Sequence, residues 1–230
     1  MSDLQCPARV FVARHGQARY AVANVLTDAG GTLTDLGREQ AAALADRLRP
    51  HRLAVVYTSQ LRRAVQTGEV VAQALGVPSS VIDGVHEFAA GSLEGASWDV
   101  VAQAGYAAWL AGDLEARWPG GESGHQLVQR MRAALDEVAD RHRGEAVLVV
   151  SHGGVMALAL PRLAADRDAL RTASPVLPNG AVVAMERDAD GWRLVGPWPG
   201  NPFRRPPPGS LADAGGAAAA HPAAAPSEQA

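Results

Sequence analysis

Apolar and polar residues alternate in blocks along this chain. Three short apolar runs, each ended by polar residues, cover residues 9–13, 53–57 and 146–150. The runs are uninterrupted rather than alternating, which is typical of strands covered on both faces, as in a parallel sheet between helices. A fourth strand-like stretch covers residues 80–83.

Amphipathic stretches lie between these runs and predict helices. Thr34 has the side chain of an N-cap for a helix that stops at Pro50. Further helices are predicted over residues 60–75, with Gly76 ending the helix, over residues 124–142, and from just after His152.

Two late β-like runs, residues 181–185 and 192–195, flank the turn sequence Asp-Ala-Asp-Gly at residues 188–191. They predict an edge hairpin. Strands and helices that alternate in this way predict an α/β fold, a three-layer α/β/α sandwich with a mostly parallel central sheet.

The domain organisation follows from a change of composition near Gly200. Pro, Gly, Ala and Ser dominate residues 201–230, where almost no large apolar side chain is available to offset the entropy of ordering. We therefore expect one folded domain over residues 1–200 and a disordered tail over residues 201–230.

Charge and cysteine content exclude several classes of protein. All 21 basic residues of the 230 are Arg, 24 residues are acidic and the formal charge is −3, so binding of nucleic acid by bulk charge is excluded. Cys6 is the single cysteine and cannot form an internal disulfide. No apolar run approaches the roughly 18 residues that cross a bilayer, and the first residues do not resemble a signal peptide. A soluble, cytoplasmic protein without membrane partners is expected.

Reactive residue types gather where the predicted strands stop, which is the edge at which open α/β sheets bind ligands. The first run is followed by Arg14, His15, Gly16 and Gln17, the second by Arg63, the third by His152 and Gly153, and the fourth leads to Glu87.

These side chains suit phosphoryl transfer. A neutral imidazole can attack phosphorus and form a covalent intermediate. Guanidinium groups present forked donors to phosphoryl oxygens and keep their charge. Gly16 and Gly153 let the backbone approach a ligand, and Glu87 could supply a proton to the leaving oxygen.

Six sequence segments carry a resemblance to a known family: RHG at 14–16, TDLGREQA at 34–41, SQLRRAVQT at 59–67, EFAAGSLEG at 87–95, PGGES at 119–123 and SHGG at 151–154. In this order and spacing the chain resembles the histidine phosphatase superfamily, whose fold is called phosphoglycerate mutase-like. The resemblance covers nearly everything from residue 9 to residue 199.

The resemblance implies a role for each matching residue. His15 would be the nucleophile that becomes phosphohistidine, and Arg14 and Arg63 would hold the phosphoryl group. His152 would stabilise the transferring charge, and Glu87 would be the general acid and then the base. Arg62 would occupy a variable position and face solvent. No metal and no cofactor would be needed.

Two positions depart from the family pattern. Where the family usually carries a small hydroxyl residue and an Asn after RHG, this chain has Ala18 and Ala21. Either phosphate binding is weaker, or Arg19 or Asn24 compensates. The stretch after RHG also lacks the Trp, the Asn and the Gly-Trp pair of cofactor-dependent phosphoglycerate mutases.

An aromatic-rich insertion follows Glu87 and contains Trp98, Tyr106, Trp109 and Trp118. These rings either cap the crevice or pack the inserted helices onto the body of the domain. We expect this insertion and residues 19–31 to decide which substrate fits.

The sequence therefore predicts a phosphoric-monoester hydrolase of the histidine acid phosphatase type that acts on a small phosphorylated metabolite. The alternatives are a phosphoglycerate mutase-type transferase and a catalytically weak relative that binds phospho-ligands. A homodimer is compatible with the sequence.

Overall fold

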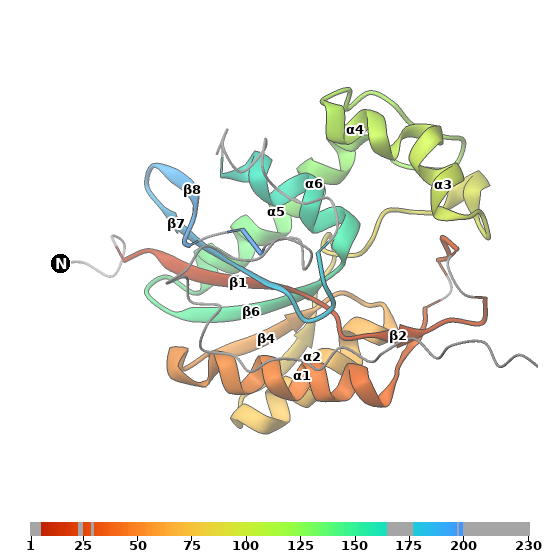
Figure 1. Ribbon diagram of the computed structural model, residues 1–230. Coiled ribbons are helices and arrows are strands. Elements are labelled where there is room, and N and C mark those ends of the chain that lie inside the picture. The colour runs from red at the N-terminus through yellow and green to blue at the C-terminus, as the bar shows by residue number, and fades with distance from the viewer. Residues whose placement is uncertain (1–5, 23–24, 29, 165–176, 197, 200–230) are drawn as a thin grey trace, which may run out of the picture.

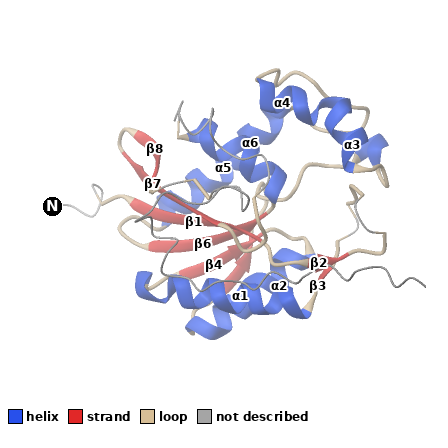
Figure 2. Ribbon diagram, in the orientation of Figure 1, coloured by secondary structure: helices blue, strands red, loops and turns tan. Residues whose placement is uncertain are grey.

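The computed structural model describes residues 6–22, 25–28, 30–164, 177–196 and 198–199. A six-stranded sheet forms its centre, in the order β5-β4-β6-β1-β7-β8. Helices cover both faces of this sheet (Figures 1 and 2). The predicted three-layer α/β/α sandwich is confirmed, and the expected tail at 201–230 lies outside the described residues.

Four neighbouring strands of the sheet are parallel, and two at one side are antiparallel. The parallel strands are β1 (Ala8–Arg14), β4 (Val55–Thr58), β5 (Ser79–Val81) and β6 (Ala146–Ser151). The predicted hairpin consists of β7 (Val182–Asp188) and β8 (Gly191–Leu194), with β8 at the edge. All predicted strands are therefore present, and their ends differ from the prediction by at most three residues.

The two helical layers use different helices. The first layer consists of α1 (Asp35–Leu48), which a 3₁₀ turn over Arg49–His51 extends, and α2 (Arg62–Leu75). The second consists of α5 (Gly124–Arg141) and α6 (Gly153–Leu163). Figure 1 shows α1 and α2 below the sheet and α5 and α6 above it.

The uninterrupted apolar runs are explained by two separate cores. Along β1, Val10 and Val12 join the core under α5 and α6, whereas Phe11 and Ala13 join the core over α1 and α2. Because successive side chains of a strand point to opposite faces, a strand covered on both sides needs apolar residues at every position.

Local signals place most helix ends. The Thr34 side chain accepts a hydrogen bond from the backbone of Gly37, and Ser123 forms a capping box with Gln126 at the start of α5. Gly76 ends α2 with φ +69°, a conformation that favours glycine. The start of α2 is the exception: it begins at Arg62 rather than at residue 60, because Leu61 has an extended backbone.

Two smaller units lie beside the carboxyl ends of the parallel strands. One is the hairpin of β2 (Ala18–Arg19) and β3 (Thr32–Leu33). The other, here called the cap, covers residues 98–111 and consists of α3 (Trp98–Val101), the π-helical turn Ala102–Tyr106 and α4 (Ala107–Ala111). A 3₁₀ turn over Gly91–Leu93 precedes it. Figure 1 shows the cap beyond the ends of α5 and α6.

No helix in the described part of the chain combines the length and the apolar character that crossing a membrane requires.

Candidate active site

Sheet register places the two predicted histidines side by side. Strands β1 and β6 are parallel and pair Arg14 with Ser151, so His15 and His152 are each the next residue beyond a paired position. The His15 amide donates to the Ser151 carbonyl at 3.0 Å. The two imidazole centroids are 5.1 Å apart, and both rings are buried.

Hydrogen bonds define the tautomer of His15. Its Nδ1 lies 2.7 Å from the carbonyl oxygen of Gly16, which can only accept, so Nδ1 carries the proton. Its Nε2 lies 3.1 Å from Nε of Arg63, which can only donate. Both contacts leave the lone pair of the imidazole on Nε2.

Burial keeps both histidines neutral. Desolvation, followed by the charges of Arg63 and Arg14, lowers the pKa of His15 to about 3. Burial and the Arg63 charge also hold the pKa of His152 well below its ordinary value. An unprotonated imidazole is the form that acts as a nucleophile.

Unpaired side-chain nitrogens, two of them guanidinium donors, surround the His15 ring. The buried atoms Nε of Arg14, Nη1 of Arg63 and Nδ1 of His152 have no hydrogen-bond partner among the described residues. Buried polar groups in proteins are almost always paired, and leaving one unpaired costs free energy. Two of these nitrogens belong to guanidinium groups, so their combination fits a bound anion.

Other contacts hold these donors in place. Arg14 donates from Nη1 to the carbonyl of Leu177, and the Arg63 guanidinium carbon lies 5.5 Å from the centre of the Tyr20 ring. Nε2 of His152 is hydrogen-bonded to Oγ of Ser59 at 2.7 Å. Contacts of this kind reduce the reorganisation that ligand binding requires.

Glu87 accepts hydrogen bonds from the first turn of α6. Its Oε2 accepts from the amide of Gly154 at 2.9 Å, and its Oε1 from the amide of Val155 at 2.8 Å. A helix N-terminus presents free amides and a partial positive charge, so it fixes a carboxylate well. A Cβ at Gly154 would lie 2.8 Å from Oε1 and 2.6 Å from the Phe88 ring, so only glycine allows this approach.

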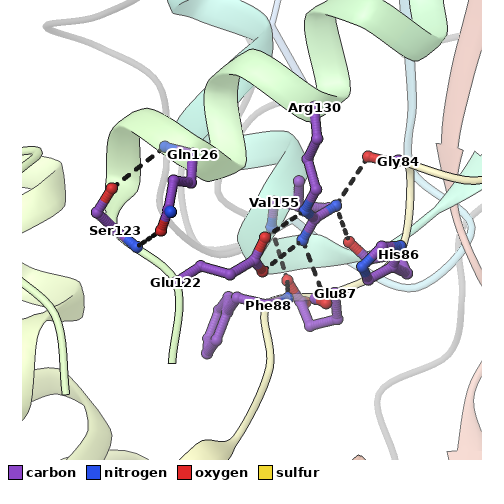
Figure 3. A network of polar contacts seen from close by, with 9 residues as sticks. All are labelled: Gly84, His86, Glu87, Phe88, Glu122, Ser123, Gln126, Arg130 and Val155. Atoms are coloured by element: carbon purple, nitrogen blue, oxygen red, sulfur yellow. Dashed lines mark hydrogen bonds and ion pairs between the residues drawn. The ribbon is translucent and has the colours of Figure 1, made fainter. Parts of the chain in front are cut away.

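Arg130 of α5 holds the backbone around Glu87 in position. Its guanidinium donates to the carbonyls of Gly84, His86 and Glu87 at 2.7, 2.8 and 3.3 Å. The same group forms a two-pronged ion pair with Glu122, at 2.6 and 2.9 Å (Figure 3). We call this arrangement the Arg130–Glu122 clamp.

A cavity of about 500 Å³ opens over the site. Arg14, His15, Arg63 and Glu87 line one end of it, together with Gly153. The structure thus brings together on one cavity most of the residues that the sequence singled out, and the His152 ring lies beside that of His15. A second hollow, of about 600 Å³, lies at the amino ends of β1 and β6, away from these residues.

Two predicted binding residues have other surroundings. Gly16 and Gln17 are not among the described residues that line the cavity. A Cβ at Gly16 would lie 2.3 Å from the Gly37 carbonyl oxygen, so this glycine serves loop packing. The exposed Gln17 donates a hydrogen bond from its backbone N–H to the side-chain oxygen of Gln40 in α1.

Arg19 and Asn24 are the two residues that could compensate for Ala18 and Ala21. Arg19 is exposed and is not among the described lining residues, and Asn24 lies outside the described part of the chain. Glu94, the next acidic residue after Glu87, accepts hydrogen bonds from Thr27 and from the Asp28 backbone amide.

The register of α2 agrees with the prediction, because Arg63 is buried and Arg62 is exposed. Sequence reasoning missed Tyr20, Leu177 and Arg130, whose contributions depend on contacts between distant segments. A Tyr side chain or a backbone carbonyl in a loop forms no sequence pattern that would reveal such a contact. In the described part of the chain, no group of three His, Cys, Asp or Glu side chains is arranged to hold a metal ion.

Comparison with solved structures first gives the class of fold. A mycobacterial glucosyl-3-phosphoglycerate phosphatase matches with a TM-score of 0.69 at 24% identity, over 85% of this chain and all of that one. The architecture is thus that of the phosphoglycerate mutase-like α/β proteins.

The sequence model of the histidine phosphatase superfamily (branch 1) matches residues 10–197. The chain belongs to this superfamily, which the motifs had indicated.

Two curated relatives carry different functional names. The metal-independent phosphoserine phosphatase of Arabidopsis thaliana is 34% identical over 154 residues, which are 64% of this chain and 65% of that protein, just under two thirds of its length. A probable phosphoglycerate mutase of Salmonella choleraesuis (strain SC-B67) is 31% identical over 72% of this chain and 82% of its own.

The lowered pKa of His15 predicts how stability depends on pH. The unfolded chain takes up a proton on this histidine near pH 6.5, whereas the folded chain does so only near pH 3, so acid favours unfolding below about pH 6.5. Between pH 7.5 and 5.5 the wild type should lose about 1 kcal/mol more unfolding free energy than His15→Ala. Urea denaturation at both pH values measures this difference, with exposed His125→Ala as the control that keeps the wild-type dependence. Equal dependence in wild type and His15→Ala would contradict the assignment.

Proposed function

We propose that this protein is a phosphatase that hydrolyses phosphomonoesters of small metabolites through a phosphohistidine at His15. The observation that carries the proposal is the neutral His15 imidazole among buried nitrogens of Arg14, Arg63 and His152 that have no hydrogen-bond partner in the described residues. Membership of the superfamily and the similarity to the Arabidopsis phosphoserine phosphatase both support a phosphatase.

In the first step, Nε2 of His15 attacks phosphorus, a P–N bond forms and the ester P–O bond breaks. Arg14 and Arg63 hold the non-bridging oxygens, and Nδ1 of His152 donates to one of them. Glu87, in its protonated form, gives its proton to the leaving oxygen.

In the second step, Glu87 takes a proton from a water molecule as that water attacks phosphorus. The P–N bond breaks, its electron pair returns to Nε2, and inorganic phosphate leaves. Glu87 thereby regains the proton that it gave up, and both residues are ready for another cycle.

Mutase-type transfer is the second candidate, because the Salmonella relative carries that name. A mutase must keep its phosphohistidine while the substrate reorients, and its substrate has a carboxylate that needs a cation of its own. The charged described residues that line the cavity are Arg14, Arg63 and Glu87, which all belong to its phosphoryl end. Hydrolysis is therefore favoured.

One set of assays tests the proposal against both alternatives. Wild type, His15→Ala and the exposed control His125→Ala are incubated with p-nitrophenyl phosphate, and with 3-phosphoglycerate plus a trace of 2,3-bisphosphoglycerate. We expect hydrolysis in wild type and control and none in His15→Ala. Rapid quenching with a ³²P-labelled ester should give protein-bound label that acid removes and base does not. Interconversion without phosphate release would favour the mutase, and no reaction of any variant would favour a binding protein.

Neighbouring arginines of α2 provide a matched pair of variants. Arg63→Ala should lower kcat/KM about a hundredfold or more, on the scale of losing one transition-state donor, whereas exposed Arg62→Ala should stay within about twofold of wild type. Steady-state kinetics with p-nitrophenyl phosphate measures both, and thermal melting checks that both variants are folded. A damaging Arg62→Ala with a harmless Arg63→Ala would refute the assignment of Arg63.

The Arg130–Glu122 clamp predicts a leaving-group effect. Without Arg130 the backbone of Glu87 loses its support, so proton donation suffers more than phosphoryl binding. Arg130→Gln should lower kcat about tenfold or more for an alkyl phosphate, which needs protonation of its leaving oxygen, and much less for p-nitrophenyl phosphate. The exposed Arg132→Gln on the same helix is the control. Equal losses with both esters would indicate a merely structural role for the clamp.

A further inference from the structure

The cavity over the site has two chemically different ends. Its phosphoryl end carries Arg14, His15, Arg63 and Glu87. The remaining described lining is apolar or aromatic apart from Thr27 and glycines, and its larger side chains are Tyr20, Val25, Leu26, Trp98, Tyr106, Leu110 and Leu177. Tyr20 and Leu177 contact Arg63 and Arg14, and we call the part formed by the other residues the leaving-group end.

The cap supplies one wall of the leaving-group end. Its contributing residues are Trp98 of α3, Ala102 and Tyr106 of the π-helical turn, which is kinked at Gly105, and Leu110 of α4. All four line the cavity. The cap therefore presents apolar and aromatic side chains to the ligand.

Packing holds this wall in position. The Phe88 ring stacks on Tyr106, with centroids 5.5 Å apart, and meets Trp98 edge-on at 6.1 Å. Phe88 itself rests on the buried rings of Trp109 and Trp118. The two alternatives for the aromatic insertion thus apply to different residues: Trp98 and Tyr106 line the cavity, and Trp109 and Trp118 pack the cap onto the domain.

Val25 and Leu26, which form another wall of this end, hydrogen-bond to the residues just before the cap. Leu26 exchanges backbone hydrogen bonds of 2.8 Å with Ala96 and Gly95, and Val25 forms an isolated bridge with Ser97. The leaving-group end is therefore formed by two segments that hydrogen-bond to each other, which reduces the cost of ordering it around a ligand.

An anionic group at this end would lose its water without gaining a cationic partner, because the described lining there has no cationic side chain. Burial and the nearby Glu87 carboxylate raise the pKa of Tyr106, so its phenol stays neutral. An aromatic or alkyl group, in contrast, gains free energy from being buried there.

Resting on the proposed phosphatase function, we propose that the preferred substrates are monophosphates of uncharged, largely apolar alcohols, with an aromatic ring or alkyl chain close to the ester oxygen. Phospho-compounds with a second anionic group, such as a carboxylate, are disfavoured. The cap residues Trp98 and Leu110 determine this specificity.

The test compares three esters of primary alcohols, whose leaving groups differ little in basicity: 2-phenylethyl phosphate, glycerol 1-phosphate and 3-phosphoglycerate. We expect kcat/KM for 2-phenylethyl phosphate to exceed the other two by about tenfold or more, the scale at which apolar pockets discriminate. Equal values, or a preference for 3-phosphoglycerate, would overturn the inference. Absence of phosphate release from all three and from p-nitrophenyl phosphate would instead refute the proposed function.

A pair of variants on α3 locates the specificity. Trp98→Arg places a cation in the leaving-group end, whereas Val100→Arg places the same charge on the exposed face of the same helix. The ratio of kcat/KM for 2-phenylethyl phosphate to that for 3-phosphoglycerate should fall about tenfold or more in Trp98→Arg and stay unchanged in Val100→Arg. Because each ratio is taken within one variant, a loss of folded protein cancels. Equal ratios in both variants would show that the cap does not select the substrate.

Discussion

The main constraint on this structure is a set of buried side-chain nitrogens that have no hydrogen-bond partner among the described residues. Around the neutral His15 ring, Arg14, Arg63 and His152 each present an unpaired nitrogen. Unpaired buried donors are costly, and unpaired buried charges more so, so the rest of the domain has to supply the compensating stability. The two apolar cores on either side of the sheet provide it, because every position along β1 between Val10 and Ala13 is buried.

The parallel pairing of β1 with β6 determines where the residues of the site lie relative to one another. Since Arg14 pairs with Ser151, the residues that follow them emerge at the same edge at the same height. Helix α6 then begins at Gly153 and directs its first amides at the carboxylate of Glu87. Two neighbouring strand ends thus position two imidazoles, a guanidinium and a helix N-terminus at one edge of the sheet.

Patterning of the sequence predicted the layers and most of the site. Uninterrupted apolar runs are a local signal of buried strands, and polar residues at strand ends are a local signal of a ligand site, so His15, Arg63 and His152 were found in this way. The Arg130–Glu122 clamp and the Tyr20 contact were not, because α5 and the segment after β1 are far from their partners in sequence. Helix α2 was expected two residues too early, since nothing in the residue types revealed the extended backbone of Leu61.

Phe88 follows Glu87 directly in the chain, and its ring supports the aromatic side chains of the cap. Glu87, which is assigned to proton transfer, and Phe88, which supports the aromatic wall of the cavity, are therefore neighbours in the chain. We expect changes at Trp98 or Leu110 to alter substrate preference while the reaction centre stays intact. A change at Phe88 is expected to affect turnover and preference together, so evolution and enzyme engineering alike have more freedom at Trp98 and Leu110 than at Phe88.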